Sequence, residues 1–202
     1  MIRRDYYLNK LIDYKDKDII KILYVGRFEE RRNIRFIIDI FHKVQENNDN
    51  VKLYLIGTGD KEYVQNCFSH INELGLEDKV VWQEKMEQKF LSRIYQMADF
   101  FLLPTEYEIF GMVLLEAMYY KNIVLTTNNG GSSTLIENEV NGFVLENKDV
   151  DSWAKCIKEI YSNKRKLQEI QENAFLSVAK KFTWDALAEK FIEQYKNKLK
   201  GE

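Results

Sequence analysis

The sequence predicts an α/β fold in which a doubly wound, six-stranded parallel sheet is flanked by helices. Two observations predict it. From about residue 19, short runs rich in β-branched and aromatic residues alternate with segments of helical periodicity, which is typical of parallel strands joined by crossover helices. The chain has 202 residues, of which 45% are hydrophobic and 13% aromatic, so it can form one sizeable buried core.

The six expected strands are short apolar runs, several of which end at Gly or Pro, where strands commonly stop. They cover residues 19–25, 51–56, 79–82, 100–103, 123–126 and 142–145. The stretch between the first two strands has its apolar side chains on one helical face, and these are Ile34, Ile37, Ile38, Phe41 and Val44. Similar patterns predict helices over residues 63–74 and 90–97.

After Leu145 the pattern is helical, over residues 151–163, 164–182 and 183–200. Thr183 is the expected N-cap of the last helix, because its hydroxyl can accept from a free amide of the first turn. We expect residues 19–202 to form one domain that includes these C-terminal helices. Residues 1–18 are charged and weakly patterned, which predicts a tail or linker.

Charge and cysteine content exclude several classes of protein. Lys and Arg total 30 and Asp and Glu total 32, so the net charge of -2 gives no overall field that would attract nucleic acid or an anionic membrane. Cys67 and Cys156 lack the spacing of a zinc site and fit a reducing compartment. Without an apolar run of eighteen residues or an apolar signal region, we expect a cytoplasmic protein. Peripheral attachment to the inner face of the membrane through a partner stays open.

The first candidate site follows the first strand. Gly26 would let the backbone approach a ligand, and Arg27 and Arg32 lie on a strand-to-helix turn where both guanidinium groups could hold a diphosphate. A solvated basic turn paired with Glu29 and Glu30 is an equally good interpretation of this stretch alone.

The second candidate follows the second strand, in the phrase LIGTGDKE. As a dinucleotide fingerprint Gly57 and Gly59 are weak, because the third glycine is missing. A tight turn at the edge of a pocket is the better interpretation, with Asp60 capping the next helix.

The third candidate is TEYEIFGMVLLEAM, which follows the fourth strand and the single proline, Pro104. Helical pattern resumes at about Phe110, so Gly111 and Met112 are expected in the first turn, where free amides and the helix dipole favour a phosphate. Glu108 lies in the loop before the helix. Glu116 lies inside it, and its carboxylate should lean back toward the N-terminus, where it could accept from a ribose diol.

Both glutamates also have ordinary interpretations. Glu116 could be a residue at the boundary of the core that forms a salt bridge with a neighbour, and Glu108 could simply favour the helix dipole. We favour the functional interpretation, because an acid flanked by Leu115 and Ala117 in an apolar helix usually needs a specific partner.

The fourth candidate is the loop of residues 128–134, which follows the fifth strand. Two glycines and three hydroxyl residues there could hold an anion or sugar hydroxyls, and a plain loop with an N-cap fits equally well. All four candidates follow strands of a parallel sheet and therefore share one edge. His42 and His70 have no suitably placed nucleophile and acid, so no catalytic triad is expected.

The ordered segments GRFEERRN, LIGTGD, ADFFLLPTEYEIFGMVLLEAM, TTNNGGSS, NGFVL and FTWDALAEKF together resemble one known family. They are similar to the C-terminal, donor-binding domain of retaining GT-B fold glycosyltransferases, glycosyltransferase family 4. The resemblance covers about residues 19–198, and its most specific part is the pair of glutamates with seven residues between them.

The resemblance implies a sugar transferred with retention from a nucleotide diphosphate sugar, without a metal or other cofactor. Carried over by motif, Arg27 and Arg32 would hold the diphosphate, Glu108 would contact the transferred sugar and Glu116 would bind the ribose. The amides of the segment after Glu108 would complete the cradle. The remaining implied donor-binding residues are Gly26, Gly57, Gly59, Phe110, Gly111, Met112 and Val113.

The sequence departs from the family pattern at several places. Arg32 stands where Lys is usual and Asn33 where Gly is frequent, which keeps the charge but changes its reach. Lys121 begins a stretch that replaces the usual Gly-x-Pro, so the easy left-handed helix end is lost at a cost of about 1 kcal/mol. Thr134 stands where the family often has Glu.

Family enzymes also have an N-terminal domain that binds the acceptor. We expect an acceptor saccharide or lipid-linked glycan to require that domain or a separate chain, and we expect this chain alone to have little activity. A noncatalytic binding or assembly module that needs a partner chain is the alternative. An NAD-dependent oxidoreductase is disfavoured by the incomplete glycine fingerprint.

Overall fold

The computed structural model describes residues 19–46, 48–146 and 149–200, so the tail expected over residues 1–18 lies outside the described residues. Its centre is a six-stranded sheet with the order β3-β2-β1-β4-β5-β6 and parallel pairing throughout. The strands are β1 (Ile20–Val25), β2 (Val51–Ile56), β3 (Val80–Gln83), β4 (Phe100–Leu103), β5 (Ile123–Thr126) and β6 (Phe143–Val144). The predicted sheet is confirmed.

Strand boundaries differ from the prediction mainly at the sheet's edges. β2, β4 and β5 agree with it, whereas β1 begins one residue later and β3 is shifted by one residue. β6 has only two residues, which pair with Leu125 and Thr126. As an edge strand it has one neighbour, so fewer ladder bonds fix its length than fix a central strand.

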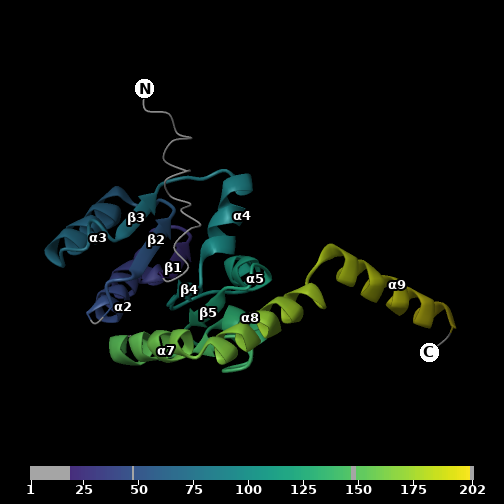
Figure 1. Cartoon of the computed structure of the whole chain (residues 1–202). Helices are drawn as coiled ribbons and strands as arrows, with labels where there is room; N and C mark the ends of the chain where they lie inside the picture. Colours follow the sequence, from purple (N-terminus) through teal and green to yellow (C-terminus); the bar gives the residue numbers. More distant parts are fainter. Residues whose placement is uncertain (1–18, 47, 147–148, 201–202) are drawn as a thin grey trace.

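The helices are α2 (Ile34–Gln45), α3 (Lys61–Glu73), α4 (Gln88–Met97), α5 (Met112–Tyr119), α6 (Gly130–Leu135), α7 (Val150–Ser162), α8 (Lys164–Ala179) and α9 (Trp184–Lys200), with a short 3-10 turn, η1 (Glu30–Arg32). Right-handed crossovers in this strand order put α2 and α3 on one face of the sheet and α4 and α5 on the other (Figure 1). α7 packs on α2 and α8 packs on α5. Strands covered on both faces explain why the strand residues are almost all buried and apolar.

Two predicted helix caps are confirmed. The Asp60 carboxylate accepts from the Tyr63 amide at 3.1 Å, and α3 begins at Lys61, two residues before the predicted start. The Thr183 hydroxyl accepts from the Ala186 amide at 3.3 Å at the start of α9. Side-chain caps of this kind fix where a helix begins, which periodicity alone does not.

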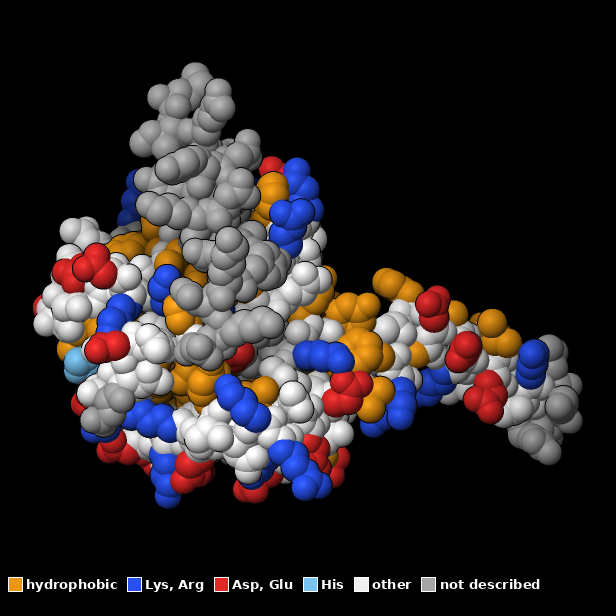
Figure 2. All heavy atoms as spheres, in the orientation of Figure 1, with side chains coloured by type: hydrophobic (Ala, Val, Ile, Leu, Met, Phe, Trp, Pro, Cys, Tyr) orange, Lys and Arg blue, Asp and Glu red, His pale blue; other side chains and the backbone are white. Residues whose placement is uncertain are grey.

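α9 projects away from the sheet and its flanking helices (Figure 1). Large apolar side chains along it are exposed, with Trp184 at 88% and Tyr195 at 69% of full exposure, and Figure 2 shows apolar side chains gathered along this helix. Within the described residues, the structure has no helix that is both long enough and apolar enough to cross a membrane.

The end of α5 is left-handed although no glycine stands there. Lys121 adopts the left-handed conformation itself, with φ of 63°, and its amide bonds to the Met118 carbonyl at 3.0 Å. Its ammonium lies 2.5 Å from Glu172 and over the Phe175 ring. The left-handed helix end is therefore made without glycine, and side-chain contacts offset part of its strain.

We expect Glu139→Gly to raise the free energy of unfolding by about 1 kcal/mol, because Glu139 also has a left-handed backbone, with φ of 64°. Lys121→Gly should give a smaller change, about 0.5 kcal/mol or less, since it removes the ion pair together with the strain. Urea unfolding of both variants measures the difference. Equal gains in the two variants would contradict a stabilising role for the Lys121 contacts.

Candidate functional site

The candidate site lies where the strand order reverses. β1 pairs with β2 on one side and with β4 on the other. The chain leaves β1 toward one face of the sheet and leaves β4 toward the other, and in open α/β sheets this point of the carboxyl edge is the crevice where ligands bind. Two sequence-predicted residues, Arg32 from the first loop and Glu108 from the second, meet there.

Backbone contacts hold these two loops together. The Glu106 amide bonds to the Arg31 carbonyl at 3.1 Å, and the buried Thr105 hydroxyl lies 3.1 Å from the same oxygen. Asn33, which is left-handed with φ of 54°, donates its side-chain amide to the Pro104 carbonyl at 2.8 Å. Asn tolerates this conformation and adds a contact that Gly could not make, so Asn33 ties the two loops.

Arg32 and Glu108 form the central pair of the crevice. The guanidinium Nη1 lies 2.5 Å from Glu108 Oε2, and each side chain keeps 17% of its exposure. Arg32 Nε is buried and has no hydrogen-bond partner among the described residues. The site therefore combines a buried donor that lacks a protein acceptor with a partly exposed guanidinium–carboxylate pair, and such a pair suits phosphate oxygens and hydroxyl groups.

Arg27 is placed differently from Arg32. Its side chain is 75% exposed and pairs with Glu29 at 2.6 Å, and the other Glu29 oxygen pairs with Arg31 at 2.8 Å. This is the solvated pairing that the sequence left open. The structure thus separates the two arginines, with Arg32 in the crevice and Arg27 outside the central pair.

Gly111 begins α5 rather than lying within its first turn. It is the N-cap, with φ of 80°, and α5 starts at Met112, so the expected start at about Phe110 is two residues early. A left-handed residue cannot continue a right-handed helix. The first-turn amides of Met112 and Val113 have no partner within the helix and stay available at this edge.

Glu116 accepts a hydrogen bond from the Tyr95 hydroxyl of α4 at 2.9 Å. The expected alternative was a salt bridge, and the partner is instead a tyrosine that is almost fully buried. Burial, and then the nearby Glu116 carboxylate, raise the pKa of Tyr95, so its hydroxyl stays protonated and donates. Tyr95 was missed because its position fits the apolar face of its helix and nothing in the sequence shows where its hydroxyl reaches.

Gly57 and Gly59 allow the loops after β1 and β2 to lie side by side. The Gly26 amide bonds to the Ile56 carbonyl and the Phe28 amide to the Thr58 carbonyl, both at 3.0 Å. A Cβ atom at Gly57 would lie 1.8 Å from the Gly26 oxygen, and one at Gly59 would lie 1.8 Å from the Phe28 oxygen. Gly59 also lines a hollow of about 300 Å³, so the predicted pocket edge is confirmed, but the segment forms a parallel bridge to Phe28 rather than the predicted tight turn.

The loop of residues 128–134 is a capped helix start rather than an open cradle. Asn129 and Ser132 cap each other reciprocally, and the hydroxyls of Ser133 and Thr134 both donate to the Gly130 carbonyl. The Gly131 amide bonds to the Glu108 carbonyl at 3.1 Å. The interpretation as a loop with an N-cap is therefore confirmed, and the loop also supports the backbone of Glu108.

Other reactive side chains lie outside this arrangement. His70 pairs with Asp39 at 2.6 Å between α2 and α3, and both cysteines are free. Among the described residues, no three His, Cys, Asp or Glu side chains gather as metal ligands would. The donor set of the crevice is cationic and amidic, which suits an anion.

Comparison with known proteins identifies relatives of the whole domain. A family model described as glycosyl transferases group 1 matches residues 11–177. An uncharacterized glycosyltransferase of Methanocaldococcus jannaschii is 33% identical over 177 residues, which are 87% of this chain and 44% of that protein. The chain thus spans less than half the length of this relative.

Solved structures match the fold. The C-terminal domain of a glycosyl transferase group 1 family protein from Francisella tularensis has a TM-score of 0.76 and 20% identity, covering 85% of this chain and 91% of that one. The Anabaena protein HepE in complex with UDP-glucose has a TM-score of 0.80 and 21% identity, covering 96% and 54%. The sheet has the Rossmann-like fold of the C-terminal domains of GT-B glycosyltransferases, as predicted.

Proposed function

The chain belongs to the glycosyl transferases group 1 family, and we propose that it is the donor-binding domain of a retaining glycosyltransferase of family 4. It would transfer a sugar from a nucleotide diphosphate sugar to an acceptor in polysaccharide, lipopolysaccharide or glycoconjugate synthesis. The observation that carries this proposal is the meeting of Arg32 and Glu108 in the crevice where the strand order reverses.

Each member of the central pair has a role in the proposed transfer. Negative charge develops on the departing diphosphate, and the partly exposed guanidinium group of Arg32 stabilises it through charge-assisted hydrogen bonds. Glu108 accepts hydrogen bonds from hydroxyl groups of the transferred sugar. Arg27 would join the diphosphate site only by leaving Glu29, so we expect it to contribute less than Arg32.

The remaining donor contacts are proposed along the same edge. The amides of Gly111, Met112 and Val113 face the phosphates, because the start of α5 carries the positive end of the helix dipole. Glu116 accepts from the ribose hydroxyls. These groups supply the positive charge that the diphosphate needs, and we propose that transfer requires no metal.

Glu116→Ala tests the ribose contact. We expect the affinity for UDP-glucose to fall at least several-fold in isothermal titration calorimetry. The reason is that the variant lacks the carboxylate that accepts hydrogen bonds from the two ribose hydroxyl groups. Glu106→Ala is the matched control, since Glu106 is exposed in the same segment and has no proposed role. Unchanged affinity in a folded Glu116→Ala variant would contradict the assignment of Glu116.

We further propose that the acceptor, a saccharide or lipid-linked glycan, binds to a second domain or chain. Support comes from the length of the relatives and from α9, whose apolar side chains have no cover in the described structure. Residues 1–18 would then be a linker and residues 19–202 the donor domain. Alone, this domain should bind a donor better than it turns one over, because an open site does not position an acceptor or exclude water.

The exposed face of α9 also favours a second candidate, a noncatalytic module that assembles with a partner chain. Its exposed apolar side chains are Trp184, Phe191, Ile192 and Tyr195. Sedimentation velocity distinguishes the two functions when it is combined with titration of UDP-glucose. Concentration-dependent association that Phe191→Glu abolishes, together with no binding of UDP-glucose, would favour the assembly module.

A further inference from the structure

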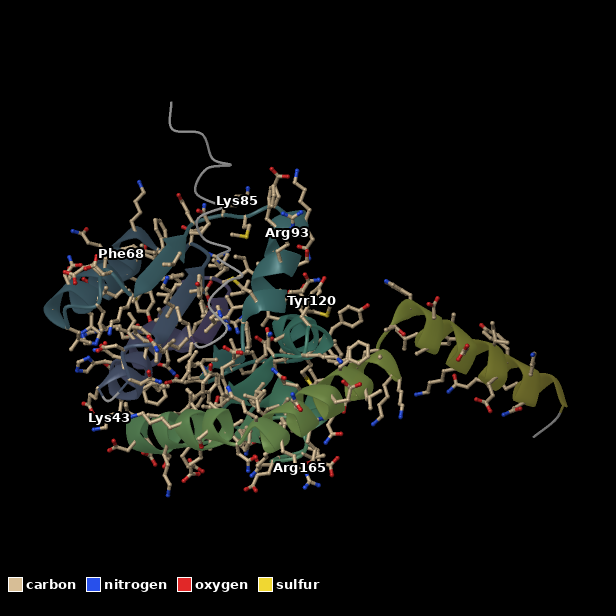
Figure 3. The ribbon with its side chains drawn as sticks, viewed as in Figure 1. Lys43, Phe68, Lys85, Arg93, Tyr120 and Arg165 are labelled. Carbon is tan, nitrogen blue, oxygen red and sulfur yellow. The ribbon has the colours of Figure 1, made fainter. Side chains whose placement is uncertain are left out.

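A buried tyrosine lies behind the carboxylate proposed to bind the ribose. Tyr95 is 1% exposed, on the last turn of α4, and its hydroxyl donates to Glu116 Oε2 on α5 at 2.9 Å. Its ring stacks on Tyr120 with 5.8 Å between centroids and an interplanar angle of 10°. Figure 3 labels Tyr120 beside α5. The hydroxyl is therefore held by packing as well as by its hydrogen bond.

Asn122 fixes the two helices relative to one another. Its side-chain amide is fully buried and donates to the carbonyl oxygens of Tyr95 at 2.7 Å and Ala98 at 2.8 Å. The Asn122 backbone amide bonds to the Ala117 carbonyl at 2.9 Å, so the same residue closes the end of α5. The donor on α4 and the acceptor on α5 thus belong to one rigid unit.

The buried hydroxyl needs an explanation that packing does not give. Phenylalanine at position 95 would fill the same space without the cost of burying a polar group. The hydroxyl holds one oxygen of a partly exposed carboxylate and restricts its rotation. Glu116 Oε1 is then presented in a fixed direction, and a carboxylate oxygen can accept more than one hydrogen bond.

We propose that Tyr95 is a positioning residue that orients Glu116 toward the ribose hydroxyls of a nucleoside diphosphate without touching the nucleotide. This inference rests on the proposed function. A pre-oriented carboxylate loses less side-chain entropy when the ligand binds, so the hydroxyl of Tyr95 adds to ribose recognition in particular. It should not change the affinity that comes from the diphosphate and the base.

Tyr95→Phe tests the inference with UDP and 2′,3′-dideoxy-UDP as probes in calorimetry. In the wild type, UDP should bind more tightly than the dideoxy compound. In Tyr95→Phe the ratio of the affinity for UDP to that for the dideoxy compound should fall about fivefold. The affinity for the dideoxy compound should be unchanged, because only the ribose contact is affected. Tyr120→Phe is the matched control, since it alters the stacked ring's hydroxyl and should leave the preference as it is.

The outcomes distinguish failure of the proposed role of Tyr95 from failure of the proposed function. If Tyr95→Phe lowers the affinity for both probes equally, the hydroxyl of Tyr95 has a structural role only. This result would overturn the inference. Retained preference in Tyr95→Phe, together with lost preference in Glu116→Ala, would also overturn it while the proposed function stands. Failure of the wild type to bind any of UDP, GDP and ADP would overturn both. In the Glu116→Ala background, Tyr95→Phe should have no further effect on UDP affinity.

Discussion

Replacing Arg32 with methionine should lower the affinity of the chain for UDP by at least tenfold. Methionine keeps much of the apolar stem and removes the guanidinium that faces the crevice. Hydrogen bonds to charged groups contribute roughly 1.5–3 kcal/mol each, so losing one or two of them corresponds to a factor of about ten or more. Calorimetry at constant ionic strength measures the change, because salt screens such contacts.

The neighbouring arginines provide matched controls. Arg31 and Arg27 share the same loop but pair with Glu29 in solvent, so Arg31→Met and Arg27→Met should each change the affinity about threefold or less. Equal losses in all three variants would show that overall charge, rather than the crevice, attracts the ligand. Because Arg32→Met leaves the Glu108 carboxylate unpaired, the double variant with Glu108→Gln separates lost stability from lost binding.

Gly57→Ala should lower the free energy of unfolding by at least about 4 kcal/mol. The added Cβ would lie 1.8 Å from the Gly26 carbonyl oxygen, and this neighbour is backbone in a paired loop that cannot move without breaking the contact between the β1 and β2 loops. The left-handed φ of 142° adds strain for any side chain. Chemical denaturation followed by circular dichroism measures the loss.

Gly75→Ala is the matched control for Gly57→Ala. Gly75 is also left-handed, with φ of 65°, but a Cβ there would meet nothing within 4 Å. Its cost should be about 1 kcal/mol, from backbone strain alone. Similar losses in the two variants would mean that conformation rather than close approach explains the glycine at position 57.

Sequence patterns predicted the fold because they depend on local periodicity. The runs over residues 51–56, 100–103 and 123–126 became strands with those same bounds, since buried central strands are continuous apolar segments. The start of α5 was placed two residues early, because Phe110 fits an apolar period and only the left-handed Gly111 shows that the helix begins later. Hydrophobic periodicity cannot show the backbone angle of an individual residue such as Gly111.

The sequence also predicted that the candidate residues share one edge of the sheet, but it did not predict which of them form pairs. Topology alone places Arg32 and Glu108 after neighbouring strands, and the structure shows that these two meet while Arg27 turns to Glu29. Which arginine pairs with Glu108 depends on distances in space between segments that lie 76 residues apart in the sequence. The hydroxyl of Tyr95 is a similar case, because its partner Glu116 is on another helix.

The central claim, that this domain binds a nucleotide diphosphate sugar, is tested most directly by a thermal-shift panel of UDP-, GDP- and ADP-sugars. A ligand at 100 times its dissociation constant should raise the free energy of unfolding by about 2.7 kcal/mol. We predict that at least one of the sugars stabilises the wild type and that Arg32→Met reduces this effect. No stabilisation by any of them would contradict the claim.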